Sequence, residues 1–135
     1  MSNSTPTSEF VTDTMGLVLR LEGRRMSATA RAIFEAVEAG QATLHVPGMV
    51  FAEILYLSEK RRISISLRDV AEYLNRYPRC HECPFSLAIA QAAGEITDIP
   101  ELHDRVIAAT ARWLGLPLIT NDPVIQASAA LSAVW

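Results

Sequence analysis

Four acidic residues that lie far apart in the chain stand where a carboxylate is unusual unless something binds it. Asp13 and Asp122 each close a short apolar run of the kind that forms a buried strand. Glu53 interrupts the most apolar stretch of the chain, and Asp104 stands near the start of an expected helix. Acids in such places are usually paired, protonated or bound to a metal, because removing a lone carboxylate from water is costly. The four acids therefore predict a site for a hard cation with oxygen ligands, Mg²⁺ or Mn²⁺.

The elements that would position these acids alternate along the chain between strands and helices. Strands are expected over residues 10–13, 43–46, 80–84, 118–120 and 131–135. Helices are expected over residues 16–21, 27–38, 47–61, 66–77, 87–95 and 102–114 and from 123 onward. Such alternation implies a parallel sheet covered on both faces, with ligands at the carboxyl ends of its strands. We expect an α/β fold, one domain with a central parallel sheet of about four to five short strands and helices on both faces.

Composition bounds the class of protein. The chain has 135 residues, which fits one domain, expected over residues 10–135 after a disordered tail at 1–9. No apolar run approaches the ~20 residues of a membrane span, and the polar start does not resemble a signal peptide, so we expect a cytoplasmic protein without membrane contact. Half of the residues are hydrophobic, which suggests that a partner covers apolar surface. Candidates for that surface are Trp113, Trp135 and the run Leu55, Tyr56 and Leu57, which suggest a homodimer.

Two basic clusters interrupt a chain whose formal net charge is -3. Arg24 and Arg25 form the first, and Lys60 with Arg61 and Arg62 forms the second. The overall charge does not indicate a nucleic-acid partner. Each cluster is consistent either with a solvated helix end or loop or with contact to an RNA phosphate backbone, and the sequence leaves both open.

The cysteines and histidines give weaker indications of a functional site. Cys80 and Cys83 have the C-x-x-C spacing of a zinc site, but no second pair of soft ligands completes one, so two free thiols are expected. His103 could act as a base beside Asp104, and His45 lies in an expected strand; neither is needed for metal-dependent chemistry. Glycine patterns for dinucleotide or P-loop binding are absent from the sequence.

Four short motifs, taken in order, resemble the PIN domain and, more narrowly, the VapC-type toxins of bacterial toxin–antitoxin pairs. They are the segments Val11–Thr14, Phe51–Ile54, His103–Ala111 and Leu118–Asp122. The most specific part is Asp-Arg-x-Ile-x-Ala-Thr-Ala, followed about ten residues later by Leu-Ile-Thr-x-Asp. The resemblance covers nearly the whole chain from Phe10 onward.

What the resemblance implies is a Mg²⁺- or Mn²⁺-dependent endoribonuclease that cleaves RNA and is neutralised by a small antitoxin protein. Its acidic cluster would be Asp13, Glu53, Asp104 and Asp122, supported by the polar residues Thr14 and Thr120. The chemistry of phosphodiester hydrolysis assigns roles within this set, because a bound metal activates water and neutralises phosphate charge. We assign Asp13 and Asp122 to direct metal contact, and Glu53 and Asp104 to a second metal or to ordering the attacking water.

A second interpretation is a catalytically silent PIN-like module that binds RNA or a protein. The presence of all four acids favours catalysis, because a concentrated negative pocket would hinder simple RNA binding.

Overall fold

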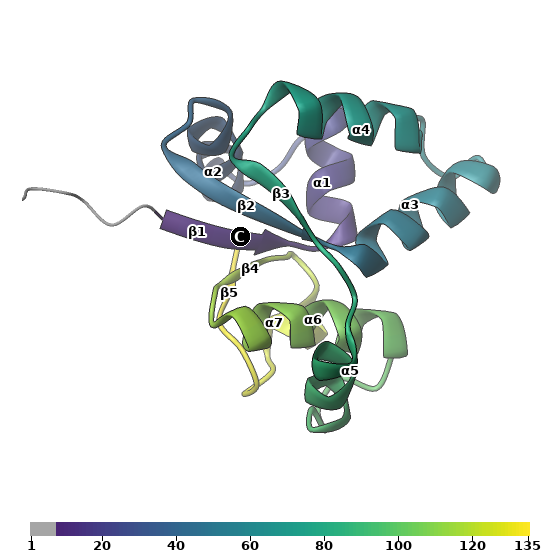
Figure 1. The fold of residues 1–135 in the computed structure, drawn as a ribbon, viewed down its shortest axis with the longest axis vertical. Helices are drawn as coiled ribbons and strands as arrows, with labels where there is room; N and C mark the ends of the chain where they lie inside the picture. The colour runs from purple at the N-terminus through teal and green to yellow at the C-terminus, as the bar shows by residue number, and fades with distance from the viewer. Residues whose placement is uncertain (1–7) are drawn as a thin grey trace, which may run out of the picture.

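The computed structural model describes residues 8–135, whose strands form one five-stranded parallel sheet in the order β3-β2-β1-β4-β5 (Figure 1). The strands are β1 (Ser8–Thr12), β2 (Ala42–Pro47), β3 (Cys80–Cys83), β4 (Leu118–Ile119) and β5 (Ala133–Val134). The helices are α1 (Thr14–Leu21), α2 (Ala28–Glu38), α3 (Gly48–Glu59), α4 (Leu67–Arg76), α5 (Leu87–Gly94), α6 (Leu102–Leu114) and α7 (Pro123–Gln126).

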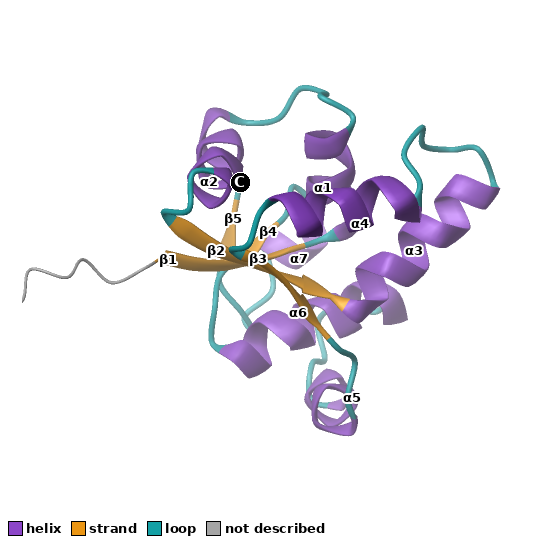
Figure 2. Ribbon diagram, turned by 45° about the horizontal axis from the view of Figure 1, so that its top comes forward, coloured by secondary structure: helices purple, strands orange, loops and turns teal. Residues whose placement is uncertain are grey.

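The sheet lies between two groups of helices. Figure 1 shows α1, α2 and α4 on one side of it and α5, α6 and α7 on the other, and Figure 2 shows the same strands between these layers after rotation. The predicted α/β fold, with a parallel sheet and helices on both faces, is confirmed. This arrangement brings the carboxyl ends of β1 and β4 side by side, because Thr12 pairs with Ile119.

The core is built from apolar side chains on both faces of the sheet. Val11, Leu44 and Leu118 are fully buried on the three neighbouring strands β1, β2 and β4. Fully buried Ala108 and Ala109 allow α6 to lie close against the sheet, and α6 contacts β1 directly. Truncating a large side chain in such a core typically lowers the stability of the fold by about 2–5 kcal/mol. This packing therefore holds the strand ends in fixed positions.

The first strand begins earlier than the sequence predicted. Residues 1–7 of the predicted disordered tail lie outside the described residues, but Ser8 and Glu9 pair with Ala42 and Thr43 as part of β1. The predicted start of this strand at residue 10 is therefore wrong by two positions. Polar residues extend this strand because its backbone hydrogen bonds need no apolar side chain. The Glu9 carboxylate also lies 2.8 Å from Nε2 of His45 on the neighbouring strand.

Helix caps explain where most of the helices begin. The Asp13 side chain accepts a hydrogen bond from the Gly16 N–H and starts α1 at Thr14, two residues before the predicted start. Ser27 and Ser86 cap α2 and α5 through the same kind of contact, as their sequence positions predicted. Helix α6 ends at Gly115, which adopts the left-handed conformation that favours glycine.

Cys80 and Cys83 are free and buried, as expected, and burial raises the pKa of the Cys80 thiol to about 12. Of the apolar residues proposed for a partner surface, Leu55, Tyr56 and Trp113 are exposed, whereas Trp135 packs partly against the core. Among residues 8–135, none of the helices combines the length and the apolar character that crossing a bilayer requires.

Candidate active site

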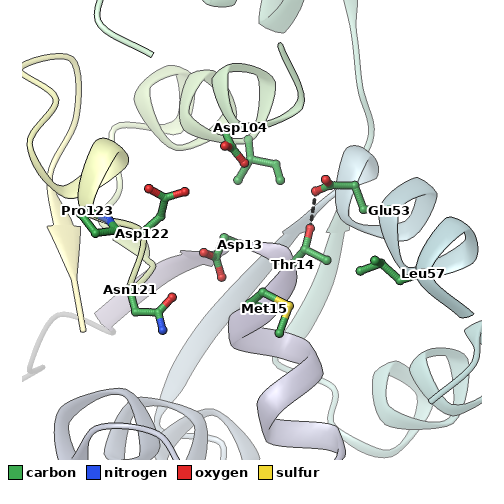
Figure 3. A pocket seen from close by; sticks show the side chains of 10 residues that line it. Asp13, Thr14, Met15, Glu53, Leu57, Asp104, Asn121, Asp122 and Pro123 are labelled. Carbon is green, nitrogen blue, oxygen red and sulfur yellow. Dashed lines mark hydrogen bonds between the residues drawn. The ribbon is translucent and has the colours of Figure 1, made fainter. Parts of the chain in front are cut away.

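A pocket of about 340 Å³ opens at the carboxyl ends of β1 and β4 and contains all four predicted acids (Figure 3). Asp13 follows β1, Asp122 follows β4, Glu53 comes from α3 and Asp104 comes from the first turn of α6. The remaining lining residues are Thr14, Met15, Leu57, Ile107, Asn121 and Pro123. Four chain segments that are far apart in sequence therefore present carboxylates to one cavity.

Asp13 is the most deeply buried of the four acids, with 8% of its surface exposed. Its backbone N–H donates to the Ile119 carbonyl at 3.1 Å, which ties the end of β1 to β4. Its Oδ1 accepts the Gly16 N–H at 2.7 Å. Burial raises its pKa to about 6, assisted by the charges of Asp122 and Glu53 and opposed by hydrogen bonds from Thr120 and Gly16.

Glu53 is held in place by its neighbour across the pocket. The Thr14 hydroxyl donates a 2.5 Å hydrogen bond to Glu53 Oε1, drawn as a dashed line in Figure 3. Thr14 is itself buried at the start of α1, so its hydroxyl has little freedom to turn away. Thr14, which the sequence analysis predicted to support the acids, thus contacts one of them directly.

Asp104 lies in the first turn of α6, where its backbone N–H donates to the Glu101 side chain at 2.7 Å. Its own carboxylate is left free of that capping contact and faces the pocket (Figure 3). Burial raises the pKa of Asp104 to about 6, and the charges of Glu101, Asp122, Glu53 and Asp13 add to this rise. The repulsion links Asp104 electrostatically to the three other acids.

Asp122 caps the short helix α7, because its Oδ1 accepts the Val124 N–H at 2.8 Å. Its own N–H donates to the Thr120 hydroxyl at 3.1 Å. Thr120 is fully buried and does not line the pocket, so it acts on the site only through its contacts with Asp122 and Asp13. These contacts define how the two strand-end acids sit relative to each other.

The donor set suits a hard cation, but not a cage made of protein ligands alone. Within residues 8–135, no three His, Cys, Asp or Glu side chains are close enough to hold a single ion between them. Mg²⁺ usually keeps several waters and takes only one or two carboxylates. A cavity with four carboxylates and room for water fits that pattern, with Asp13 and Asp122 from adjacent strand ends as the nearest source of ligands.

The sequence analysis did not identify the apolar residues that line the pocket, and it also missed Asn121 and Gly16. Asn121 lines the pocket beside Asp122, and only its place within the motif Leu118–Asp122 could have indicated it. Gly16 has no room for a side chain: a Cβ there would lie 2.7 Å from Thr12 Oγ1 and 3.1 Å from Asp13 Oδ1. Its spacing of three residues from Asp13, typical of an N-cap contact, was the available signal.

Other sequence candidates lie outside the pocket. Arg24, Arg25, Arg61 and Arg62 are exposed and none lines it. His103 Nδ1 lies 3.0 Å from Glu101 Oε1, and its side chain lines a neighbouring cavity that shares Glu53 and Leu57 with the pocket. The polar groups that line the pocket are therefore carboxylates, an amide and a hydroxyl, and no basic side chain is among them.

The family model described as PIN domain matches residues 10–131. The chain belongs to the PIN-domain family. Among curated proteins, the sequence search finds no match.

Solved structures with the same PIN fold include chains of toxin–antitoxin complexes. A chain of VapBC2 from Rickettsia felis, bound to a promoter DNA fragment, has a TM-score of 0.69 at 16% identity, covering 93% of this chain and 97% of that one. A chain of DNA-bound VapBC from Salmonella typhimurium has a TM-score of 0.67 at 18% identity, covering 95% and 98%. VapC20 from Mycobacterium tuberculosis, a toxin that cleaves the sarcin-ricin loop, has a TM-score of 0.59 at 17% identity, covering 91% and 98%. At these identities the likeness establishes a VapC-like PIN fold.

Proposed function

We propose that this PIN domain is a Mg²⁺- or Mn²⁺-dependent endoribonuclease and the toxin of a toxin–antitoxin pair. The observation that carries the proposal is the convergence of Asp13, Glu53, Asp104 and Asp122 on one pocket at the strand ends. Membership of the PIN family supports a nuclease, and the metal requirement follows from the donor set.

The four acids would divide the work of hydrolysing a phosphodiester bond. When bound, the metal would lower the pKa of a coordinated water and neutralise charge on the scissile phosphate. Asp13 and Asp122 would hold it, because they extend from adjacent strands into the same cavity. Glu53 and Asp104 would orient the attacking water or contact a second ion. Thr14 would keep Glu53 directed into the pocket through its hydrogen bond.

The electrostatics of the pocket support this assignment. The pKa values of Asp13 and Asp104 are both raised to about 6, by burial first and by their acidic neighbours in addition. Bringing such groups together disfavours their charged forms. A divalent cation would reverse that effect, so the pocket would gain stability from the ion that catalysis needs.

The partners belong to the same proposal. Because chains of the same fold occur in VapBC complexes, we propose a cognate antitoxin that neutralises this chain, with cytoplasmic RNA as substrate.

Exposed Leu55 and Tyr56 on α3 are the proposed contacts of a homodimer. Light scattering at micromolar concentration would exclude the dimer if it returned the mass of one chain. Normal growth of cells that express the chain without any antitoxin would count against toxicity.

The nuclease proposal is tested by the products of RNA cleavage. Purified protein is expected to cleave RNA with Mg²⁺ or Mn²⁺, to stop when EDTA is added, and to leave a 5′-phosphate and a 3′-hydroxyl. These ends follow from attack by water rather than by the ribose 2′-hydroxyl. The Glu53→Gln variant should retain its fold and lose most of this activity. Products with a 2′,3′-cyclic phosphate would overturn the roles of all four acids.

A further inference from the structure

Four helices end in the same hydrogen-bonded turn, in which a backbone N–H donates to the carbonyl five residues earlier. In α1, α2 and α6 the residue that must adopt the left-handed conformation is glycine: Gly23, Gly40 and Gly115. Helix α3 ends in the same way, with the Arg62 N–H donating to the Leu57 carbonyl at 2.9 Å. The left-handed residue there is Arg61, with φ of 55°, the only non-glycine residue with positive φ among residues 8–135.

An arginine at this position is unfavourable for the backbone. A Cβ disfavours the left-handed conformation, and glycine would close the same turn without that strain. The Arg61 side chain is exposed, so packing in the core does not offset the backbone strain. Strained residues are often kept for what their side chains do, which makes the Arg61 guanidinium a candidate contact group.

The loop that carries Arg61 is fastened to the loop after α1. Glu22, at the end of α1, accepts hydrogen bonds from the Ser64 N–H at 2.5 Å and from the Ser64 hydroxyl at 2.8 Å. This contact ties the loop that carries Arg24 and Arg25 to the loop that follows Lys60, Arg61 and Arg62, although the two basic clusters lie 36 positions apart in the sequence. We call these five residues the cation patch.

Most of the charge on the cation patch is available to a ligand. Within the described residues, Arg24 forms an ion pair with Glu22 at 3.0 Å, whereas Arg25, Arg61 and Arg62 form none. Lys60 Nζ lies 5.8 Å from the centre of the Tyr56 ring and remains exposed. Glu59 is the other acid beside the patch in sequence. Arginine side chains at such a surface can bind phosphate through paired N–H donors.

The cation patch lies at the far ends of the two helices that leave the acidic pocket. Figure 1 shows α1 and α3 starting beside each other near the carboxyl ends of β1 and β2. Thr14 begins α1 in the pocket, and the helix then runs for about 12 Å towards Arg24. Glu53 in α3 is about 10 Å from Lys60 by the same measure. One RNA strand could span these distances with a few phosphates.

We infer that the cation patch is a second RNA contact that holds the phosphate backbone a few nucleotides away from the acidic pocket. This inference rests on the proposed ribonuclease function. The chain has a net charge of -3 and its pocket is lined by acids, so both would repel RNA unless a local cluster of cations attracted it. That need favours RNA over an acidic peptide as the ligand.

The test measures RNA binding in EDTA, where metal-dependent cleavage does not interfere, using a fluorescein-labelled RNA hairpin with single-stranded ends and fluorescence polarisation. Arg61→Gly should weaken binding roughly three- to tenfold at low salt and lower the salt slope by about 1. The same variant should melt about 2–4 °C higher than the wild type, because the backbone strain is removed. This opposite movement of stability and binding separates a contact residue from a structural one.

Two control variants accompany it. Arg61→Lys keeps both the charge and the backbone strain, so it should melt like the wild type and bind RNA more tightly than Arg61→Gly, although without the paired N–H donors of arginine. Arg112→Gln removes one positive charge from the exposed end of α6, away from the patch, and should bind RNA like the wild type.

Arg61→Gly that binds the RNA hairpin as tightly as the wild type would overturn the inference. The same holds if patch variants keep RNA binding but lose binding to an acidic partner protein. Wild-type protein that binds through the patch but never cleaves RNA would overturn the proposed function and leave this inference standing.

Discussion

The hydroxyl of Thr14 and the carboxylate of Glu53 are joined by a 2.5 Å hydrogen bond, although the two residues are 39 positions apart. The bond connects the first residue of α1, which follows β1, to the middle of α3, which follows β2. It therefore fixes a pocket acid relative to Asp13, the residue next to Thr14. Neighbouring strands of the sheet thus determine how two of the four acids are oriented.

Replacing Thr14 should reveal the importance of this bond. Thr14→Val keeps the shape of the side chain but leaves Glu53 without its donor, so we expect RNA cleavage to fall roughly tenfold to a hundredfold. Thr14→Ser keeps the hydroxyl and should retain most of the activity. Initial rates of cleavage for both variants, with thermal melting as the control for folding, provide the measurement. Equal activity of Thr14→Val and the wild type would remove the positioning role.

The stability of the metal-free protein should fall as pH rises from about 4 to about 6. The folded-state pKa of Asp13 is about 6, above its ordinary value of 3.8, so the folded protein binds a proton more tightly than the unfolded chain. This contribution to stability is fully present below about pH 4, and it is lost as pH rises from there through about 6. For Asp13 alone it amounts to about 3 kcal/mol, and Asp104 acts in the same direction.

Urea unfolding in EDTA at several pH values measures this dependence. Burial raises the pKa of Glu38, but hydrogen bonds from Arg20 and Tyr73 outweigh it and lower that pKa, so its opposing effect appears only near pH 4 and below. The part of the fall in stability that lies above pH 5 therefore reports on the pocket acids. Asp13→Asn should make the curve shallower in that range and leave the part due to Asp104, and a variant curve with the same slope as the wild type would contradict the raised pKa of Asp13.

Divalent metal should stabilise the wild type at neutral pH. An ion that binds only the folded state raises the melting temperature by mass action, and millimolar Mn²⁺ is expected to do so here. Asp122→Asn should melt at the same temperature with and without the metal, because one of the proposed ligands is gone. Calorimetry on both proteins tests the site without relying on activity. No shift and no detectable binding for the wild type would remove the metal-site proposal.

Gly16 provides a test of how tightly the pocket is built. Gly16→Ala would place a Cβ 2.7 Å from Thr12 Oγ1 and 3.1 Å from Asp13 Oδ1, so the Thr12 side chain must shift, the Asp13 carboxylate must give slightly, and activity should fall. Gly94→Ala is the matched control, since nothing lies within 4 Å of its Cβ and α5 should gain about 0.5–1 kcal/mol. Normal cleavage by Gly16→Ala would mean that the exact position of Asp13 is unimportant.

The sequence was sufficient to predict the order of elements and the four acids because both depend on local patterns. Apolar runs ending in Asp13 and Asp122 mark strand ends, and parallel strands bring those ends together. Gly16 was missed because its importance arises from a close approach that only coordinates reveal. The contact between the loops of the two basic clusters was missed for a related reason: the Glu22–Ser64 hydrogen bonds span 42 positions and follow no periodic pattern.

The most direct test of the central claim compares RNA cleavage and RNA binding by the wild type, Asp13→Asn and Asp122→Asn. If the carboxylates hold a catalytic metal, each variant should lose cleavage by at least about a hundredfold while keeping its fold. A PIN domain that only binds RNA would instead bind more tightly in both variants, most clearly at low salt, because negative charge is removed near a polyanion. Tighter binding in both variants, together with no metal-dependent cleavage by the wild type, would contradict the ribonuclease proposal.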